Sequence, residues 1–326
     1  MLTMLSCRSC GDMVDMAAVK CRCSGGIPDL RPGTDIGDNH SMIYDQIASD
    51  DLLSPMQPDD SKAEKASADM RRLGPHLDTS RKLDILEIGP GDGHFLRLLG
   101  RFGRTVAADV TRVYLEKLGF ADGRILAQIE HLPFEEQFDV IVLCDVLEHV
   151  LNEGDALLSL NRALRPGGIV FIRCPANEPL VGYSTHGGSP YPYVHLRTYS
   201  PRDLRRVVSF AGFQTLESGY SARVPIGFAR RSFGIPALGR ARAIRHTREV
   251  LSANGIDTVD ANSRLDAVVT KVESATWYLL RRLPGSGRLE RLLAAVWYRG
   301  SESFVVARKF EGVFSHEMMS TEGAST

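Results

Sequence analysis

A short apolar stretch that runs into three closely spaced glycines limits the folds open to this chain more than any other feature. Residues 83–88 are mostly apolar, and Gly89, Gly91 and Gly93 follow at alternate positions. The apolar run predicts a buried strand, and the glycines predict a tight turn into a helix. Glycine adopts positive φ and lets a ligand approach the main chain, while the helix N-terminus beyond the turn offers unpaired N–H groups. By itself this pattern fits several nucleotide-binding folds.

Three further apolar segments extend the pattern downstream. Residues 105–110 predict a second strand that ends in Asp109, about twenty residues after the first glycine. A carboxylate at that place can accept hydrogen bonds from both hydroxyls of a ribose. Residues 138–143 and 169–172 predict two more buried strands, with helix-forming stretches between them. This alternation predicts an α/β fold with a mostly parallel sheet and helices on both of its faces.

In this order the segments resemble the class I S-adenosylmethionine-dependent methyltransferases. The resemblance is closest to the small-molecule branch that includes quinone-biosynthesis enzymes, and residues 147–149 (Leu-Glu-His) match a motif of that branch. It covers roughly residues 81–220 and a last strand at 303–308. The resemblance implies a Rossmann-like fold, an enzyme, S-adenosylmethionine as cofactor and a small molecule as methyl acceptor.

The resemblance also implies a set of cofactor-binding residues: Glu87, Gly89, Gly91, Gly93, Asp109, Gln128 and Ile129. Glu87 would orient the amino group of the methionine moiety, and the glycines would bring the backbone against that moiety and the ribose. Asp109 would hold the ribose hydroxyls, although a helix N-cap is the alternative role. Gln128 stands where the family places an Asp against the adenine amino group. The main-chain N–H of Ile129 could serve there instead.

Two histidines are candidate catalytic bases. An oxygen acceptor needs a base, because a neutral hydroxyl is a poor nucleophile, and histidine suits that task at neutral pH. By resemblance, His149 lies near the transferred methyl group, and His195 occupies another position where such enzymes carry histidine. The alternative for each is a histidine that braces a loop. Asp145, Glu148 and His149 are also close enough in sequence to form a metal site. We expect O-methylation of a sugar, a glycan precursor or a secondary metabolite.

Four of the six cysteines lie in the first 23 residues, at Cys7, Cys10, Cys21 and Cys23. Two short cysteine pairs predict a structural zinc site, because thiolates are good ligands for this ion. Residues 25–30 resemble the end of the zinc-ribbon module that precedes some bacterial methyltransferases. The second pair has one intervening residue where two are usual, so a degenerate ribbon without metal is the alternative.

The chain divides into six expected regions. They are a zinc-ribbon-like module (1–33), a linker and leading helix (34–80), the methyltransferase core (81–220), a helical insertion or cap (221–300), a last core strand (301–311) and a disordered tail (312–326). Tyr44 and Ile47 would belong to a segment that closes over the cofactor, and the long loop 175–199 would form a lid that faces the substrate. The 221–300 region mixes arginines with apolar residues. It predicts a cap packed on the core, a surface for a membrane or lipid-linked substrate, or a homodimer contact.

Composition narrows the function classes. The net charge of −1 over 326 residues gives no sign of polyanion binding. No apolar run reaches the ~20 residues that span a bilayer, and no signal-peptide pattern opens the sequence, so a cytoplasmic location is expected. Two other functions remain open. The first is a ribosomal-RNA methyltransferase, since some of these carry a zinc ribbon, and the second is a non-catalytic subunit that binds a partner through residues 221–300.

Overall fold

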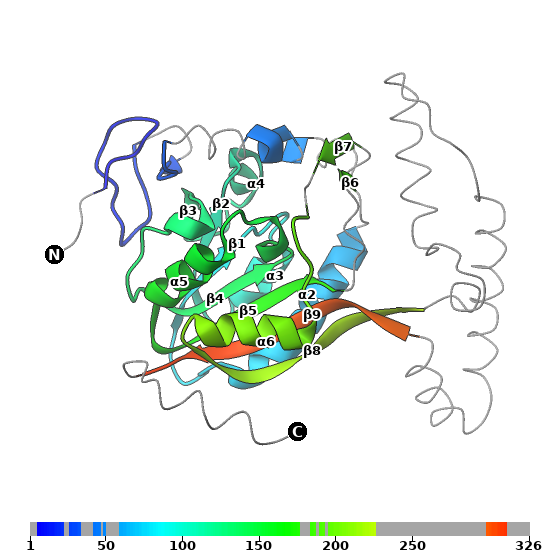
Figure 1. Cartoon of the computed structure of the whole chain (residues 1–326). Helices are drawn as coiled ribbons and strands as arrows, with labels where there is room; N and C mark the ends of the chain where they lie inside the picture. Colours follow the sequence, from blue (N-terminus) through cyan, green and yellow to red (C-terminus); the bar gives the residue numbers. More distant parts are fainter. Residues whose placement is uncertain are drawn as a thin grey trace.

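The computed structural model describes residues 5–22, 26–33, 42–46, 48–49, 59–176, 183–186, 189–192, 195–225 and 298–311. Within them, seven strands form one sheet in the order β3-β2-β1-β4-β5-β9-β8 (Figure 1). The strands are β1 (Leu83–Ile88), β2 (Gly103–Asp109), β3 (Gly123–Leu126), β4 (Phe138–Cys144), β5 (Leu164–Pro175), β8 (Phe213–Pro225) and β9 (Tyr298–Lys309). The first five pair in parallel, and β9 runs antiparallel to β5 and β8. The predicted Rossmann-like, mostly parallel sheet is confirmed.

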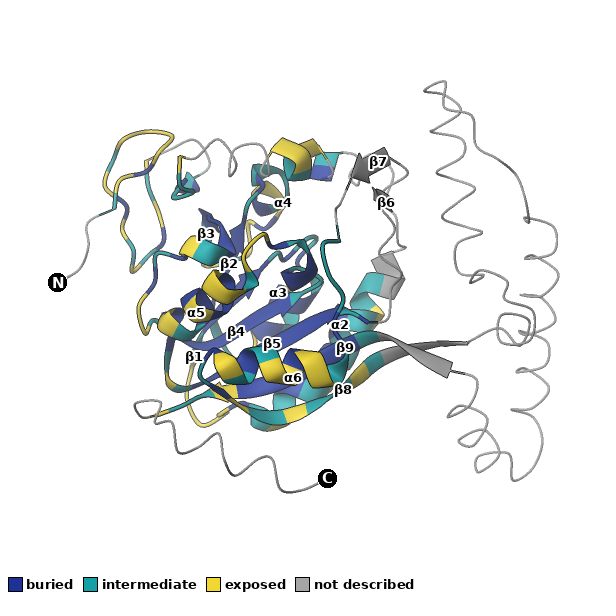
Figure 2. Ribbon diagram, in the orientation of Figure 1, coloured by how far each residue is buried: buried dark blue, intermediate teal, exposed yellow. Residues whose placement is uncertain are grey.

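Helices cover both faces of this sheet (Figure 2). They are α2 (Asp59–Leu73), α3 (His94–Leu99), α4 (Arg112–Lys117), α5 (Glu153–Ala163) and α6 (Pro201–Phe210), with short 3-10 turns η2 (Gly74–His76), η3 (Ile129–His131) and η4 (Leu147–His149). In β1, Leu86 and Ile88 belong to a buried apolar cluster that also includes residues of α5 and α6. Leu83 and Ile85 belong to a second cluster that includes residues of α2 and α3. A strand buried on both faces needs apolar residues at nearly every position, which explains the continuous apolar runs in the sequence.

The N-terminal module lies against the β3 edge of the sheet (Figure 1). Asp29 pairs in parallel with Leu126, the last residue of β3. Val19 and Ile27 are fully buried and join the apolar clusters of the core. Burial of these two side chains and the backbone pairing tie the module to the domain.

The structure describes some of the other predicted segments, and the rest lie outside the described residues. The helix expected before β1 is α2, and the last strand is β9. Part of the expected loop 175–199 forms an antiparallel pair, β6 (Tyr183–His186) with β7 (Ser189–Pro192). Two glycines lie between them in the sequence, a composition typical of hairpin connections. Nearly all of the 221–300 region and the whole tail lie outside the described residues, as do the membrane, lipid and dimer contacts expected there. None of the described helices is both long and apolar enough to span a membrane.

Candidate active site

The glycine turn follows β1 as the sequence predicts. Gly89, Gly91 and Gly93 all have positive φ, at 63°, 52° and 75°. A Cβ at Gly89 would overlap the side chain of Val146, while a Cβ at Gly91 would meet open space. The turn is therefore pressed against the segment after β4 on one side and open on the other, and α3 begins directly after Gly93.

A cavity lies beyond the carboxyl ends of β1, β2 and β4. In open parallel sheets this is the edge where ligands bind. Its lining residues are Tyr44, Ile88, Gly89, Gly91, Asp109, Val110, Thr111, Tyr114, Ala127, Ile129, Glu130, Asp145, Val146, His149 and Val150. The cavity thus joins the glycine turn, one predicted ribose ligand and one predicted base. Tyr44 also lines it, whereas Ile47, expected in the same closing segment, lies outside the described residues.

Two buried carboxyl groups flank the turn. Asp109 ends β2, and its Oδ1 accepts a hydrogen bond from the N–H of Thr111 at 2.8 Å. Burial raises the pKa of Asp109 to about 7. Glu87 is 3% exposed, and its Oε2 has no hydrogen-bond partner among the residues that the structure describes. Burial raises the pKa of Glu87 to about 8, although the charge of Arg173 and the N–H of Leu96 act in the opposite direction. A buried carboxyl oxygen without a partner is suited to a ligand that brings a donor.

The two predicted bases contact each other. The rings of His149 and His195 have centroids 4.7 Å apart, and the ring of Tyr44 packs edge-on against His149 at 5.5 Å. Glu148 is fully buried, and its Oε1 lies 3.7 Å from Nε2 of His149. The N–H of Leu196 donates to the carbonyl of Glu148 at 2.9 Å, which holds the His195 segment beside η4. Glu148, His149 and His195 also offer ligand atoms within 4.8 Å of one another.

A buried arginine organises the acidic groups next to the cavity. Arg173 of β5 forms ion pairs with Asp69 of α2 and with Asp145, which follows β4. Its Nε lies 3.9 Å from a carboxylate oxygen of Glu302 on β9. Asp145 lines the cavity with a φ of 57°, a left-handed conformation that is uncommon outside glycine. The positive charge of Arg173, on β5, therefore lies among carboxylates from α2, from β9 and from the loop after β4.

Comparison with known proteins identifies the domain. Residues 60–218 match the model of a family described as a methyltransferase domain. The chain contains a class I S-adenosylmethionine-dependent methyltransferase domain. The match spans the glycine turn, both histidines and all the described lining residues of the cavity except Tyr44. The family implies S-adenosylmethionine as the cofactor and an acceptor of the methyl group.

Individual relatives are similar to parts of this chain. A ubiquinone biosynthesis O-methyltransferase of Rickettsia prowazekii is 31% identical over 99 residues, which are 28% of this chain and 39% of the relative. A protein of the same name from Methylocella silvestris is 28% identical over 156 residues, 41% of this chain and 59% of the relative. The chain thus spans less than two thirds of either relative.

The solved structures that align with this chain are more distant in sequence. The [4+2]-cyclase SpnF aligns with a TM-score of 0.48 and 15% identity, over 89% of this chain and all of the other. A methyltransferase from Archaeoglobus fulgidus aligns with a TM-score of 0.45 and 14% identity, over 76% of this chain and 94% of the other.

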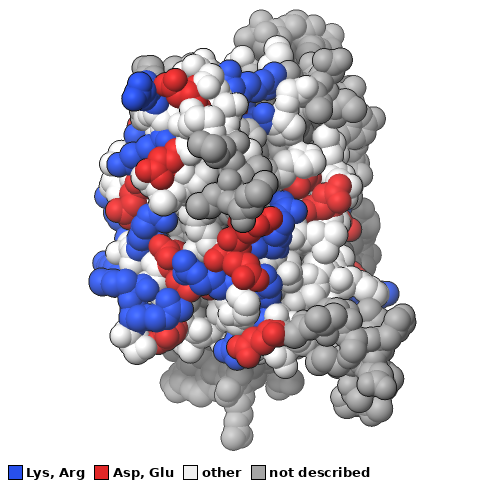
Figure 3. Space-filling model, turned by 90° about the vertical axis from the view of Figure 1, so that its left-hand side faces the viewer, with Lys and Arg blue, Asp and Glu red and all other residues white. Residues whose placement is uncertain are grey.

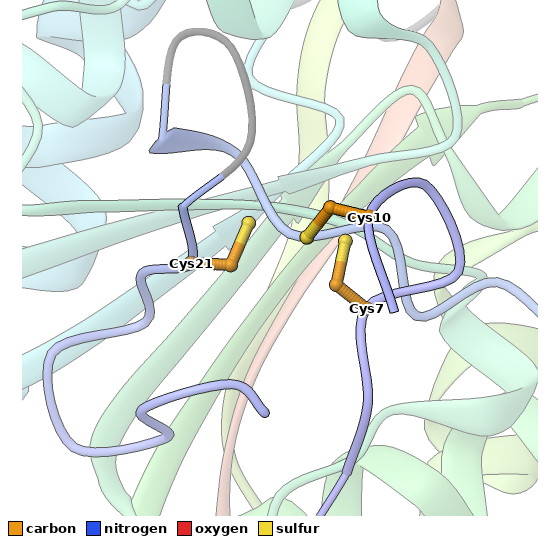
Figure 4. Close-up of side chains that lie close together, drawn as sticks. All are labelled: Cys7, Cys10 and Cys21. Atoms are coloured by element: carbon orange, nitrogen blue, oxygen red, sulfur yellow. The ribbon is translucent and has the colours of Figure 1, made fainter. Parts of the chain in front are cut away.

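The N-terminal cysteines of the chain converge as well, with Cys7 and Cys10 as thiols and Cys21 in a disulfide. The side chains of Cys7, Cys10 and Cys21 point toward one another (Figure 4), and their sulfur atoms lie within 4.8 Å of each other. Cys7 is buried, and its Sγ accepts a hydrogen bond from the N–H of Asp29 at 3.3 Å. Burial works to raise the pKa of Cys7, but backbone hydrogen bonds led by Asp29 outweigh it and the pKa is lowered. Cys23 lies outside the described residues.

The residues that line the cavity differ in part from the predicted site residues. Ile129 lines the cavity, whereas Gln128 is buried and is not among the lining residues of the described chain. Thr111 and Tyr114 line the cavity but were missed by sequence reasoning. Their only signal was their position directly after the strand that ends in Asp109, at the start of α4.

Proposed function

We propose that this methyltransferase transfers a methyl group from S-adenosylmethionine to a hydroxyl of a small molecule. A sugar, a glycan precursor or a secondary metabolite would be the acceptor. The observation that carries the proposal is that His149 lines the same cavity as the glycine turn and Asp109. A base and a cofactor site that share one cavity are what O-methylation requires. The relatives named as ubiquinone biosynthesis O-methyltransferases support the same class of reaction.

The residues around the turn fit the proposed cofactor. When bound, S-adenosylmethionine supplies an electrophilic methyl group on a sulfonium ion. The open side of the turn at Gly91 leaves the backbone accessible. Glu87, buried and with one unpartnered oxygen, would accept from the amino group, and Asp109 would accept from the ribose hydroxyls. Thr111 holds the Asp109 carboxylate in place through its N–H. Ile129, together with Gln128, would contact the adenine.

The histidine pair supplies the base in this proposal. His149 would take the acceptor's proton, because its ring lines the cavity, and His195 would orient that ring or bind the acceptor. Methyl transfer from a sulfonium is an in-line displacement, so most of the catalysis comes from aligning the acceptor and excluding water. Tyr44 packs against His149 and would help to close the cavity over the reactants.

Zinc in the cysteine module is a further part of the proposal. Four thiolates around a tetrahedral zinc lie about 3.8 Å from one another, as follows from Zn–S distances of about 2.3 Å. The sulfur atoms of Cys7, Cys10 and Cys21 are close enough for that spacing, but Cys21 is disulfide-bonded, so binding by these three with Cys23 as fourth ligand would first require reduction of that disulfide. We expect one zinc per chain by elemental analysis, and less in a Cys7→Ser variant. A metal-free wild-type protein would support the degenerate ribbon.

RNA methylation is the second candidate, favoured by the cysteine module alone. Figure 3 shows the face of the molecule on the side of that module, where basic and acidic residues are interspersed. Polyanion binding relies on clustered cations and weakens steeply with salt. We therefore expect no salt-dependent binding of ribosomal-RNA fragments. Tight binding that weakens with rising salt would favour the RNA acceptor instead.

The direct test is methyl transfer from labelled S-adenosylmethionine to a panel of sugars, sugar nucleotides and phenols, with RNA as a comparison. We expect His149→Asn to lower the rate at least 100-fold, in the range of general-base catalysis. His131→Asn is the matched control, because this exposed histidine does not line the cavity. Equal rates in the two variants would remove His149 from the mechanism. A wild-type protein that binds the cofactor but methylates nothing would favour the non-catalytic subunit.

A further inference from the structure

Asp145 places a carboxylate on the wall of the cavity. It follows β4 directly, and 37% of its side chain is exposed. Its Oδ2 forms the ion pair with Nη2 of Arg173 and lies 3.8 Å from Nζ of Lys65. Its Oδ1 has no hydrogen-bond or ion-pair partner among the residues that the structure describes. One oxygen of this carboxylate is therefore available to a bound ligand.

The charge state of Asp145 differs from that of the other carboxyl groups at the site. Burial works to raise its pKa, but the charges of Arg173 and Lys65 outweigh that effect and the pKa is lowered. Glu87 and Asp109 have raised pKa values instead. Because two cations already offset the charge of Asp145, a third cation would gain little there. A neutral donor such as a hydroxyl suits this oxygen, since hydrogen bonds to an ionised acceptor are stronger than those between neutral groups.

The backbone around Asp145 is fixed on two sides. Its N–H donates to the carbonyl of Arg173 at 2.9 Å, so one arginine holds both its main chain and its side chain. The next residue, Val146, packs its side chain against Gly89 of the glycine turn. Asp145 has a φ of 57°, and residues held in such conformations cluster at ligand sites. The surrounding structure thus holds this carboxylate at a set place on the cavity wall.

The proposed base belongs to the same short segment. The N–H of His149 donates to the carbonyl of Val146 at 3.0 Å, and both His149 and Asp145 line the cavity. The charge of His149 also contributes to lowering the pKa of Asp145, as expected for groups that lie near each other. An acceptor whose hydroxyl reaches His149 would therefore have its neighbouring atoms close to Asp145.

We propose that Asp145 determines acceptor specificity by accepting a hydrogen bond from a second hydroxyl, adjacent to the one that is methylated. The acceptor is then a vicinal diol, and only the hydroxyl at His149 reacts. The oxygen of that hydroxyl forms a bond to the methyl carbon, the carbon–sulfur bond breaks with its electron pair left on sulfur, and the proton passes to His149. Arg173 acts as a positioning residue for Asp145. The inference rests on the proposed function, since it assumes a hydroxyl acceptor with His149 as its base.

Two variants remove the contact in steps. Asp145→Gly deletes the carboxylate and suits the left-handed backbone, because glycine adopts positive φ without strain. Asp145→Asn keeps an uncharged oxygen at the same place, and asparagine also tolerates this conformation. Glu135→Ala is the control, because Glu135 is an exposed acid in the loop before β4 and is not among the described lining residues of the cavity. Thermal unfolding and the Kd for S-adenosylhomocysteine show whether each variant is folded with its cofactor site intact.

The measurement is methyl transfer from labelled S-adenosylmethionine to two matched pairs of acceptors. Catechol is compared with phenol, and tetrahydropyran-3,4-diol, an analogue of a sugar ring, is compared with tetrahydropyran-4-ol. Each pair gives the ratio of kcat/KM for the diol to kcat/KM for the acceptor without the second hydroxyl. We expect wild type and Glu135→Ala to favour the diol at least tenfold in one pair, because the lost hydrogen bond is to a charged group. The preference should fall to about twofold or less in Asp145→Gly and lie in between in Asp145→Asn, with the Kd for S-adenosylhomocysteine within about twofold of wild type.

Other outcomes identify which idea fails. A wild-type protein that methylates the single hydroxyl as well as the diol, or a preference that Asp145→Gly leaves unchanged, would overturn the inference while the proposed function stands. Binding of S-adenosylhomocysteine that weakens tenfold in Asp145→Asn would make Asp145 a cofactor ligand and overturn it too. A wild-type protein that methylates neither pair also overturns it, and the wider panel of sugars, sugar nucleotides and phenols then decides on the proposed function. A folded wild type that does not bind S-adenosylhomocysteine would overturn both.

Discussion

The pKa of Glu87 leads to a strong prediction about cofactor binding. This carboxyl group is buried beside the glycine turn, and burial raises its pKa to about 8. The proposed contact with the methionine ammonium needs the ionised carboxylate. Binding at neutral pH must therefore release a proton from Glu87. At pH 6 about 1% of the protein has Glu87 ionised, and at pH 8 about half, so its contribution to the association constant should rise about 50-fold.

Glu87→Gln isolates this contribution. The amide keeps the shape of the side chain but does not titrate. The amino group of the ligand titrates with both proteins, so the ratio of the wild-type to the variant association constant removes that effect. Calorimetry at pH 6, 7 and 8 measures the ratio, and Glu116→Gln on the exposed face of α4 is the control. A ratio that stays constant across this range would refute the reasoning.

The same group affects stability without ligand. The folded pKa lies above the unfolded value of 4.5, so the folded state binds more protons between the two. This contribution is fully present below about pH 4.5 and is lost as pH rises toward 8, at up to about 1.4 kcal/mol per pH unit. Chemical denaturation should show a shallower fall with pH for Glu87→Gln than for wild type.

Three more substitutions have defined outcomes. Gly89→Ala places a side chain at positive φ and against Val146. We expect it to lower the free energy of unfolding by at least about 1 kcal/mol and to weaken cofactor binding. Gly119→Ala is the control and should be neutral, because a Cβ there meets open space. Arg173→Met leaves buried carboxylates without their cation and should lower the free energy of unfolding by about 3–5 kcal/mol, measured by denaturation. A decrease below about 1 kcal/mol would contradict this. Tyr44→Leu removes part of the cavity wall and should raise KM with little loss of stability, and an unchanged KM would argue against closure.

Local sequence patterns predicted the centre of the fold and the positions of the glycine turn and Asp109 at the ends of their strands. The glycine turn and Asp109 depend on short-range features, a buried strand followed by residues with special backbone needs, so their positions follow from the sequence. His149 and His195 were each identified by resemblance. Their contact was not, because it depends on the backbone hydrogen bond that ties Leu196 to Glu148.

Features that depend on long-range packing were not predictable. The ion pairs of Arg173 form only because α2, β5 and the antiparallel β9 come together in the fold. No local sequence pattern predicts that arrangement. The attachment of the cysteine module to β3 depends on pairing between Asp29 and Leu126, which are 97 positions apart in the numbering. Gln128 is buried and is not among the described lining residues of the cavity, so its contact with adenine stays a prediction.

The central claim is that S-adenosylmethionine binds in the cavity between the glycine turn and Asp109. Calorimetric titration of zinc-replete protein with S-adenosylmethionine, repeated on Asp109→Ala and on the exposed control Asp78→Asn, tests it most directly. The account predicts a micromolar Kd for wild type and the control, and at least a tenfold weaker one for Asp109→Ala. Folded wild-type protein that does not bind, or an Asp109→Ala variant that binds as tightly as wild type, would contradict it.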